Sequence, residues 1–184
     1  MTAKPHLIII PGRGDRQWIY RLVKPWWMFL GFRVHIFVFG WNNDRTPLKK
    51  AQERLNAYIK NLDGPLYVIG VSAGGTAAVN ALASNPNITK VVTVCTPYTP
   101  LPHRPKNQLI AQSIRHTTQT LAAMSDETKA TILCLHALYD QVVPAEHNRP
   151  LGIRAKQLLA IGHGPAIATA LFFYSWTIRS FFVR

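Results

Sequence analysis

The fold is decided by one stretch, Leu66-Tyr67-Val68-Ile69-Gly70-Val71-Ser72-Ala73-Gly74-Gly75. The apolar residues before the first glycine are typical of a strand, and the small residues that follow, as far as Leu82, favour a helix. A strand that turns abruptly into a helix lifts the serine above the sheet, and the flanking glycines permit the sharp turn. Ser72 is therefore a candidate nucleophile. Because glycine-rich strand-to-helix turns also serve plain packing, the pattern Gly-x-Ser-x-Gly leaves a structural role open.

Short β-branched runs alternate with longer helical patterns along the whole chain. The predicted strands are 6–11, 33–39, 66–71, 90–96, 131–138 and 157–161. The predicted helices are 16–30, 47–62, 73–84, 106–124 and 165–183. Most of the strands are continuous apolar runs, as in strands that are buried on both faces of a parallel sheet. The order predicts an α/β fold with a doubly wound sheet of about six parallel strands, flanked by helices.

Two later strands end in side chains that could activate a serine. The strand 131–138 is followed by Asp140, and the strand 157–161 is followed by His163 between two glycines. Because the carboxyl ends of parallel strands meet at one edge of the sheet, Ser72, Asp140 and His163 are predicted to meet there as nucleophile, acid and base. The alternatives are a turn residue for Asp140 and an ordinary loop histidine for His163.

With these motifs the chain resembles the α/β-hydrolase fold family, in particular its small single-domain serine hydrolases. The resemblance extends over nearly the whole chain and implies acyl transfer to water through an acyl-enzyme, without a cofactor or a metal. The loop 10–15 looks like the family's oxyanion loop, which would give the backbone N–H groups of Arg13 and Ala73 the task of stabilising the oxyanion. Pro11-Gly12 replaces the family's common His-Gly pair, and the two antiparallel strands that usually open the fold are missing.

The composition predicts one domain over residues 1–184, with 48% hydrophobic residues to fill its core. The formal net charge is +13, from 21 Lys and Arg against 8 Asp and Glu, which favours anionic partners. The charges are scattered and no nucleic-acid-binding motif accompanies them, which argues against nucleic acid as a partner. Cys95 and Cys134 lie inside apolar runs without metal-ligand spacing, and we expect both to be reduced and buried.

Three apolar segments bear on the location of the protein. The run 7–10 is too short for a signal peptide, and we expect a cytoplasmic protein. The cluster 26–32 is predicted mainly as core, with an interface for lipid or a partner as the alternative. The segment 165–184 approaches the roughly 20 residues that span a bilayer. Because it follows His163 so closely, we expect it to cover the sheet, with a spanning helix or peripheral contact with an acidic lipid surface as the alternatives.

The proline-rich piece 97–105 interrupts the alternation, since prolines prevent regular strand pairing. We expect residues 97–126 to form a rim or a small lid above the carboxyl ends of the strands, and so short a roof favours short, uncharged acyl groups. The predicted function is hydrolysis of a carboxylic ester or related acyl bond of a small molecule. The alternatives are an interaction protein that has the same fold without turnover, and a thioesterase, amidase or lipase that acts at a membrane surface.

Overall fold

The computed structural model describes residues 4–15, 17–43, 46–101 and 107–184. These residues form a six-stranded sheet in the order β2-β1-β3-β4-β5-β6, and every neighbouring pair of strands is parallel. The strands are β1 His6–Ile10, β2 Arg33–Ile36, β3 Leu66–Val71, β4 Ile88–Val94, β5 Ile132–Tyr139 and β6 Arg154–Ile161. The strand order changes direction between β1 and β3, so the predicted doubly wound parallel sheet is confirmed.

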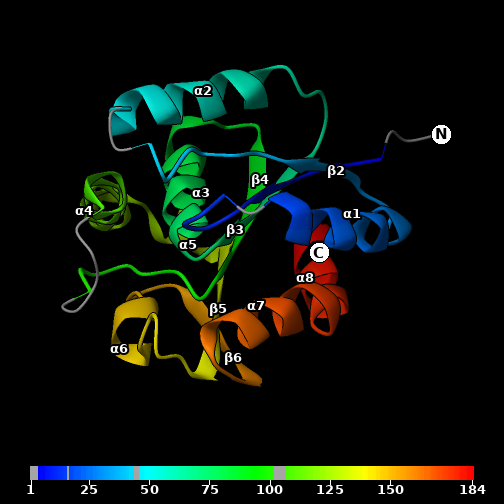
Figure 1. Ribbon diagram of the computed structural model, residues 1–184. Coiled ribbons are helices and arrows are strands. Elements are labelled where there is room, and N and C mark those ends of the chain that lie inside the picture. Colours follow the sequence, from blue (N-terminus) through cyan, green and yellow to red (C-terminus); the bar gives the residue numbers. More distant parts are fainter. Residues whose placement is uncertain (1–3, 16, 44–45, 102–106) are drawn as a thin grey trace.

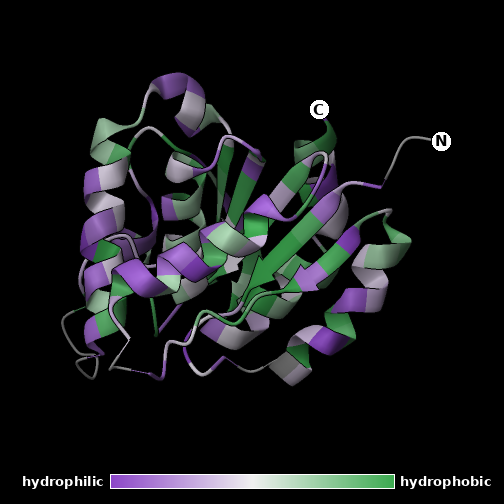
Figure 2. Ribbon diagram, turned by 90° about the horizontal axis from the view of Figure 1, so that it is seen from above, coloured by the Kyte–Doolittle hydropathy of each residue, from purple (hydrophilic) through white to green (hydrophobic). Residues whose placement is uncertain are grey.

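Helices cover both faces of the sheet (Figure 1). They are α1 Gln17–Phe29, α2 Leu48–Lys60, α3 Ala73–Ser84, α4 Gln108–Ala123, α5 Asp126–Ala130, α6 Ala145–Asn148, α7 His163–Phe172 and α8 Ser175–Val183. Trp27 and Phe182 belong to the core on the face that α1, α7 and α8 cover. Leu55 and Leu109 belong to the core on the opposite face, under α2, α3 and α4. The strands form a hydrophobic band between these two helical layers (Figure 2).

The two edge strands account for the largest errors in the strand boundaries. Strand β2 ends at Ile36, three residues before the predicted end. Strand β6 begins at Arg154, three residues before the predicted start, and its first four residues are exposed. Sequence patterns of buried strands do not reveal such a polar edge. The short helices α5 and α6 were not predicted. Arg16 and Lys106, the predicted first residues of two helices, lie outside the described residues.

The C-terminal segment forms two helices, which corrects the prediction of one helix over 165–183. Helix α7 already begins at His163, and α8 is bent away from it by 57°. The Ser175 hydroxyl fixes the break, because it donates to the Phe172 carbonyl oxygen at 2.6 Å and accepts from the Trp26 indole N–H at 2.9 Å. Within the described residues no single helix is both long enough and hydrophobic enough to cross a bilayer. Helices α7 and α8 meet these two criteria only when they are taken together as a bent pair.

The apolar cluster 26–32 is divided between core and surface. Trp27 and Phe32 are buried, as predicted, and the Trp27 indole donates to the Leu171 carbonyl oxygen at 3.0 Å. In contrast, Met28 is 48% exposed and Phe29 is 74% exposed. The prediction of a core segment is therefore correct for only part of the cluster.

Candidate active site

Ser72 stands between β3 and α3 in a backbone conformation that residues other than glycine rarely adopt. Its φ is 51° and its ψ is −125°. The Ser72 N–H donates to the Val94 carbonyl oxygen at 2.8 Å, and the Gly75 N–H donates to the Ser72 carbonyl oxygen at 3.0 Å. Such a conformation costs roughly 1–3 kcal/mol, persists only where its surroundings enforce it, and is concentrated at functional sites. The turn places the Ser72 hydroxyl at the carboxyl edge of the sheet.

Glycines surround this turn because the backbones approach too closely for side chains. A β-carbon on Gly70 would lie 2.5 Å from the Gly74 carbonyl oxygen, and a β-carbon on Gly12 would lie 2.7 Å from the Ser72 β-carbon. Only glycine avoids these contacts. Gly70 lets α3 pack closely on β3, and Gly12 lets the loop after β1 lie against the serine. The glycines thus allow close packing and also leave Ser72 accessible. A packing role for the motif is therefore compatible with a nucleophilic role for Ser72.

Asp140 and His163 form a hydrogen-bonded pair just beyond β5 and β6. The distance from His163 Nδ1 to Asp140 Oδ2 is 2.7 Å. Asp140 Oδ1 accepts from the N–H groups of Val142 and Val143 at 2.7 and 2.9 Å. Burial raises the pKa of Asp140, but the hydrogen bonds from His163 and the two backbone groups outweigh it and hold the pKa below its usual 3.8. Asp140 is therefore ionised at neutral pH, and it orients the imidazole through Nδ1, which leaves Nε2 free.

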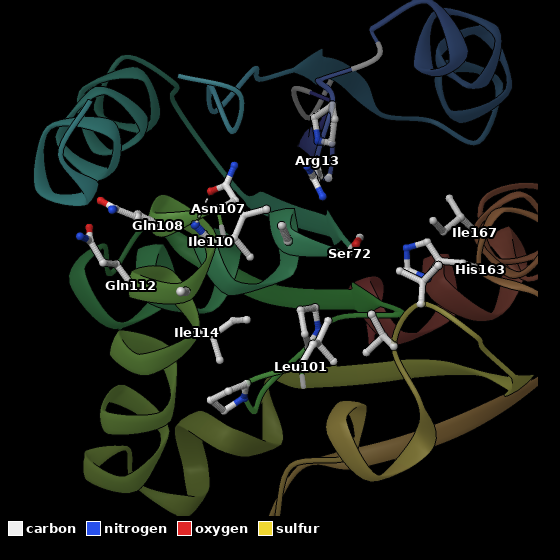
Figure 3. Close-up of a pocket in the computed structure, with 18 of the residues that line it drawn as sticks. Arg13, Ser72, Leu101, Asn107, Gln108, Ile110, Gln112, Ile114, His163 and Ile167 are labelled. Atoms are coloured by element: carbon white, nitrogen blue, oxygen red, sulfur yellow. Dashed lines mark hydrogen bonds between the residues drawn. The ribbon is translucent and has the colours of Figure 1, made fainter. Parts of the chain in front are cut away.

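Ser72 and His163 lie opposite each other in one cavity of about 870 Å³, and the His163 ring points toward the serine (Figure 3). The loop after β1, the start of α3, α4 and the start of α7 enclose the cavity, whose apolar lining includes Ile19, Tyr20, Leu101, Ile110, Ile114 and Ile167. Within the described part of the chain no hydrogen bond joins the Ser72 hydroxyl to His163. Catalytic hydrogen bonds commonly tighten only when substrate binds.

Two backbone N–H groups next to the serine have no hydrogen-bond partner among the described residues, those of Arg13 and Ala73. Ala73 is the first residue of α3, so its N–H belongs to the positive end of the helix dipole. Arg13 follows Gly12, which lies against Ser72, and the exposed Arg13 side chain reaches the cavity. The structure thus brings all five predicted site residues to one place.

Two residues at the candidate site were not predicted as site residues from the sequence, and the first is Tyr20. It lines the cavity although its spacing in α1 is that of a core residue. Burial raises the pKa of Tyr20 to about 12, although an interaction with the Gly12 backbone lowers this pKa by a smaller amount. Tyr20 therefore stays protonated beside Gly12, in the loop that carries Arg13.

The second is Cys95, which follows β4 with a φ of 50° and is fully buried. Cys95 and Cys134 are both free thiols, as predicted. The Cys95 sulfur and ligand atoms of Asp140 and His163 lie within 4.8 Å of one another. Burial, and then the charge of Asp140, raises the pKa of the Cys95 thiol, so it stays protonated. Thiol, carboxylate and imidazole can bind Zn²⁺. Here, however, imidazole and backbone N–H groups already engage both carboxylate oxygens, which favours an acid–base pair.

The expected rim, residues 97–126, has a buried part and a part that lines the cavity. Tyr98 is only 3% exposed. Helix α4 packs on α3, where the hydroxyl groups of Thr76 and Ser113 are 2.6 Å apart. The start of α4 forms one wall of the cavity (Figure 3). Residues 102–106, part of the predicted rim, lie outside the described residues.

No protein-family model matches the chain, and no curated protein sequence matches it. The crystal structure of the ydeN gene product from B. subtilis matches with a TM-score of 0.72 at 17% sequence identity, over 98% of this chain and 100% of that chain. A monoacylglycerol lipase from Paleococcus ferrophilus has a TM-score of 0.72 at 13% identity, over 98% and 96% of the two chains. The pyrethroid hydrolase PytH has a TM-score of 0.68 at 15% identity, over 96% and 97%. At these identities the similarity concerns the fold, and it extends over nearly the whole chain.

Proposed function

We propose that this chain, which has the α/β-hydrolase fold, is a serine hydrolase that cleaves a carboxylic ester or a related acyl bond through an acyl-enzyme. The observation that carries the proposal is the 2.7 Å hydrogen bond between His163 and Asp140, beside the cavity that Ser72 and His163 share. A serine hydroxyl becomes nucleophilic when an oriented base can take its proton. The lipase and hydrolase structures with the same fold support the reaction class.

In the first half-reaction, His163 Nε2 takes the hydroxyl proton while Ser72 Oγ attacks the acyl carbon, and Asp140 stabilises the imidazolium. The N–H groups of Arg13 and Ala73 donate to the oxyanion of the tetrahedral intermediate. Its collapse breaks the bond to the leaving group, which receives the proton from His163. In the second half-reaction, His163 takes a proton from water as the water oxygen attacks the acyl carbon. Collapse releases the acid and returns the proton to Ser72.

A fluorophosphonate probe tests this mechanism, because it reacts only with an activated serine. We expect the wild-type protein to be labelled at Ser72, and we expect no labelling of Ser72→Ala. Ser84→Ala, which changes an exposed serine at the other end of α3, is the control and should be labelled like the wild type. A folded wild-type protein that resists the probe would instead support a binding protein without turnover.

The size of the cavity changes the expectation about the acyl group. The short roof predicted short acyl chains, but about 870 Å³ is near the upper end of the roughly 300–1,000 Å³ of ordinary ligand sites. We therefore expect kcat/KM on para-nitrophenyl esters to increase at least about tenfold from acetyl to octanoyl, as apolar surface is buried. Ile110→Trp, which narrows the cavity, should reduce octanoyl hydrolysis far more than acetyl hydrolysis. If the acetyl or butyryl ester were hydrolysed fastest, the preference for short acyl groups that the sequence predicts would be correct.

A further inference from the structure

Helix α1 is apolar on two opposite sides. Val23 and Trp27 are 1% and 0% exposed and pack into the core. Trp18, Leu22 and Phe29 are 63%, 67% and 74% exposed. Their spacing of four and then seven residues puts them in one row on the side away from the sheet. In a surface helix that side is ordinarily polar, so this row is not explained by the packing of the protein itself.

The row continues onto the junction of α7 and α8. Phe173 and Trp176 are 84% and 57% exposed there. Trp26 connects the two parts, because its ring stacks on Phe29 at 5.8 Å between centroids and its indole N–H donates to the Ser175 hydroxyl at 2.9 Å. Helices α1 and α8 accordingly lie next to each other (Figure 1). We call this surface the aromatic face, and its residues are Trp18, Leu22, Phe29, Phe173 and Trp176.

The charged side chains on the helices that carry the aromatic face are all positive. The sequences of α1, β6, α7 and α8 contain no Asp or Glu. Arg21, three residues after Trp18, is exposed beside the row, and Lys24 is exposed elsewhere on α1. On α8 the Arg179 guanidinium lies 5.9 Å from the centre of the Trp176 ring. Long cationic side chains can keep their charges among lipid phosphates while neighbouring aromatic rings enter the apolar layer. The arrangement is complementary to an anionic lipid surface.

We infer that the aromatic face binds the surface of an anionic phospholipid bilayer. The binding is peripheral, because the buried residues Ile178 and Phe182 hold α8 on the sheet and the 57° bend prevents α7 and α8 from forming one spanning helix. Ile19 on α1 and Ile167 on α7 line the catalytic cavity, so docking through these helices would bring the cavity close to the lipid. The binding does not depend on turnover and goes beyond the proposed function.

Sedimentation with lipid vesicles tests this inference. The Ser72→Ala protein is used, so that binding is measured without hydrolysis. We expect it to pellet with vesicles of phosphatidylcholine and phosphatidylglycerol but weakly with phosphatidylcholine alone, and salt should reduce the binding. Adding Phe29→Ser and Phe173→Ser together should weaken binding on the order of tenfold or more, because both rings are lost from the contact. Adding Arg21→Gln and Lys24→Gln should have a similar effect through charge alone, roughly tenfold.

Matched controls distinguish vesicle binding through the aromatic face from nonspecific attraction between a basic protein and anionic lipid. Leu151→Ser removes a 95% exposed apolar residue that lies outside α1, α7 and α8. Lys49→Gln with Lys50→Gln removes the same charge from α2 in the opposite layer of helices. Both should bind within about twofold of the parent. Equal losses in the control and test variants, or no vesicle binding by the parent, would overturn the inference. So would a dimer in sedimentation velocity that the double serine variant abolishes, since a second copy would then cover the face. Circular dichroism checks that each variant is folded.

Discussion

Replacement of Ser72 by alanine is expected to reduce kcat for ester hydrolysis on the order of a millionfold, because no other group can take the place of the attacking oxygen. His163→Ala should have an effect of similar size, since an unactivated hydroxyl is a poor nucleophile. The two residues act as one unit, so the double variant should be no slower than either single variant. The measurement is steady-state hydrolysis of a soluble para-nitrophenyl ester.

Ser84→Ala provides the matched control, because it removes the same hydroxyl group from the opposite end of α3. It should keep wild-type kcat and KM. The fold of Ser72→Ala should persist, and its melting temperature should not fall, because alanine keeps the β-carbon and the Ser72 hydroxyl makes no hydrogen bond within the described residues. Wild-type turnover by a folded Ser72→Ala protein would exclude the mechanism.

Asp140→Asn is expected to reduce kcat by about ten-thousandfold. The amide N–H₂ group that faces His163 Nδ1 would favour the tautomer whose proton sits on Nε2, and such an imidazole cannot accept the serine proton. KM should change little, because Asp140 is buried behind the imidazole rather than in the cavity. Asp126→Asn, at a carboxylate whose side chain is 96% exposed, is the matched control and should leave kcat unchanged.

The same substitution has a signature in the pH dependence of stability. Because the pKa of Asp140 in the folded protein lies below its usual 3.8, ionisation stabilises the folded state above pH 3.8, and this contribution is lost as the pH falls through the folded value. Asp140→Asn should therefore lower the free energy of unfolding near neutral pH and much less in strong acid. Chemical denaturation of both proteins over the acid range measures the difference. A difference that does not shrink with acid would contradict the lowered pKa.

The sheet and the positions of the candidate site residues could be predicted from the sequence because their signals are local. Ser72, Asp140 and His163 follow the ends of β3, β5 and β6, and parallel strands bring such positions to one edge without any knowledge of distant contacts. Gly70 and Gly12 could likewise be expected, since a sharp turn and a close loop both exclude a side chain.

The features that the sequence did not predict depend on long-range contacts. Cys95 also follows a strand, but its position beside Asp140 is evident only when β4 and β5 are paired. The break before α8 contains neither proline nor glycine and is fixed by a hydrogen bond to Trp26 on another helix. In α1 both sides are apolar, so helical periodicity predicts the helix but cannot tell which side faces the sheet.

Helix α7 begins with His163, the proposed base, and ends with Phe172, so the two ends of this helix lie about 15 Å apart. The proposed nucleophile, Ser72, directly precedes α3, which belongs to the other layer of helices. The distance between His163 and Ser72 therefore depends on how the two helical layers pack on opposite faces of the sheet. If His163 acts as the base, a shift of α7 relative to α3 by about 1 Å would be enough to change the rate about a hundredfold.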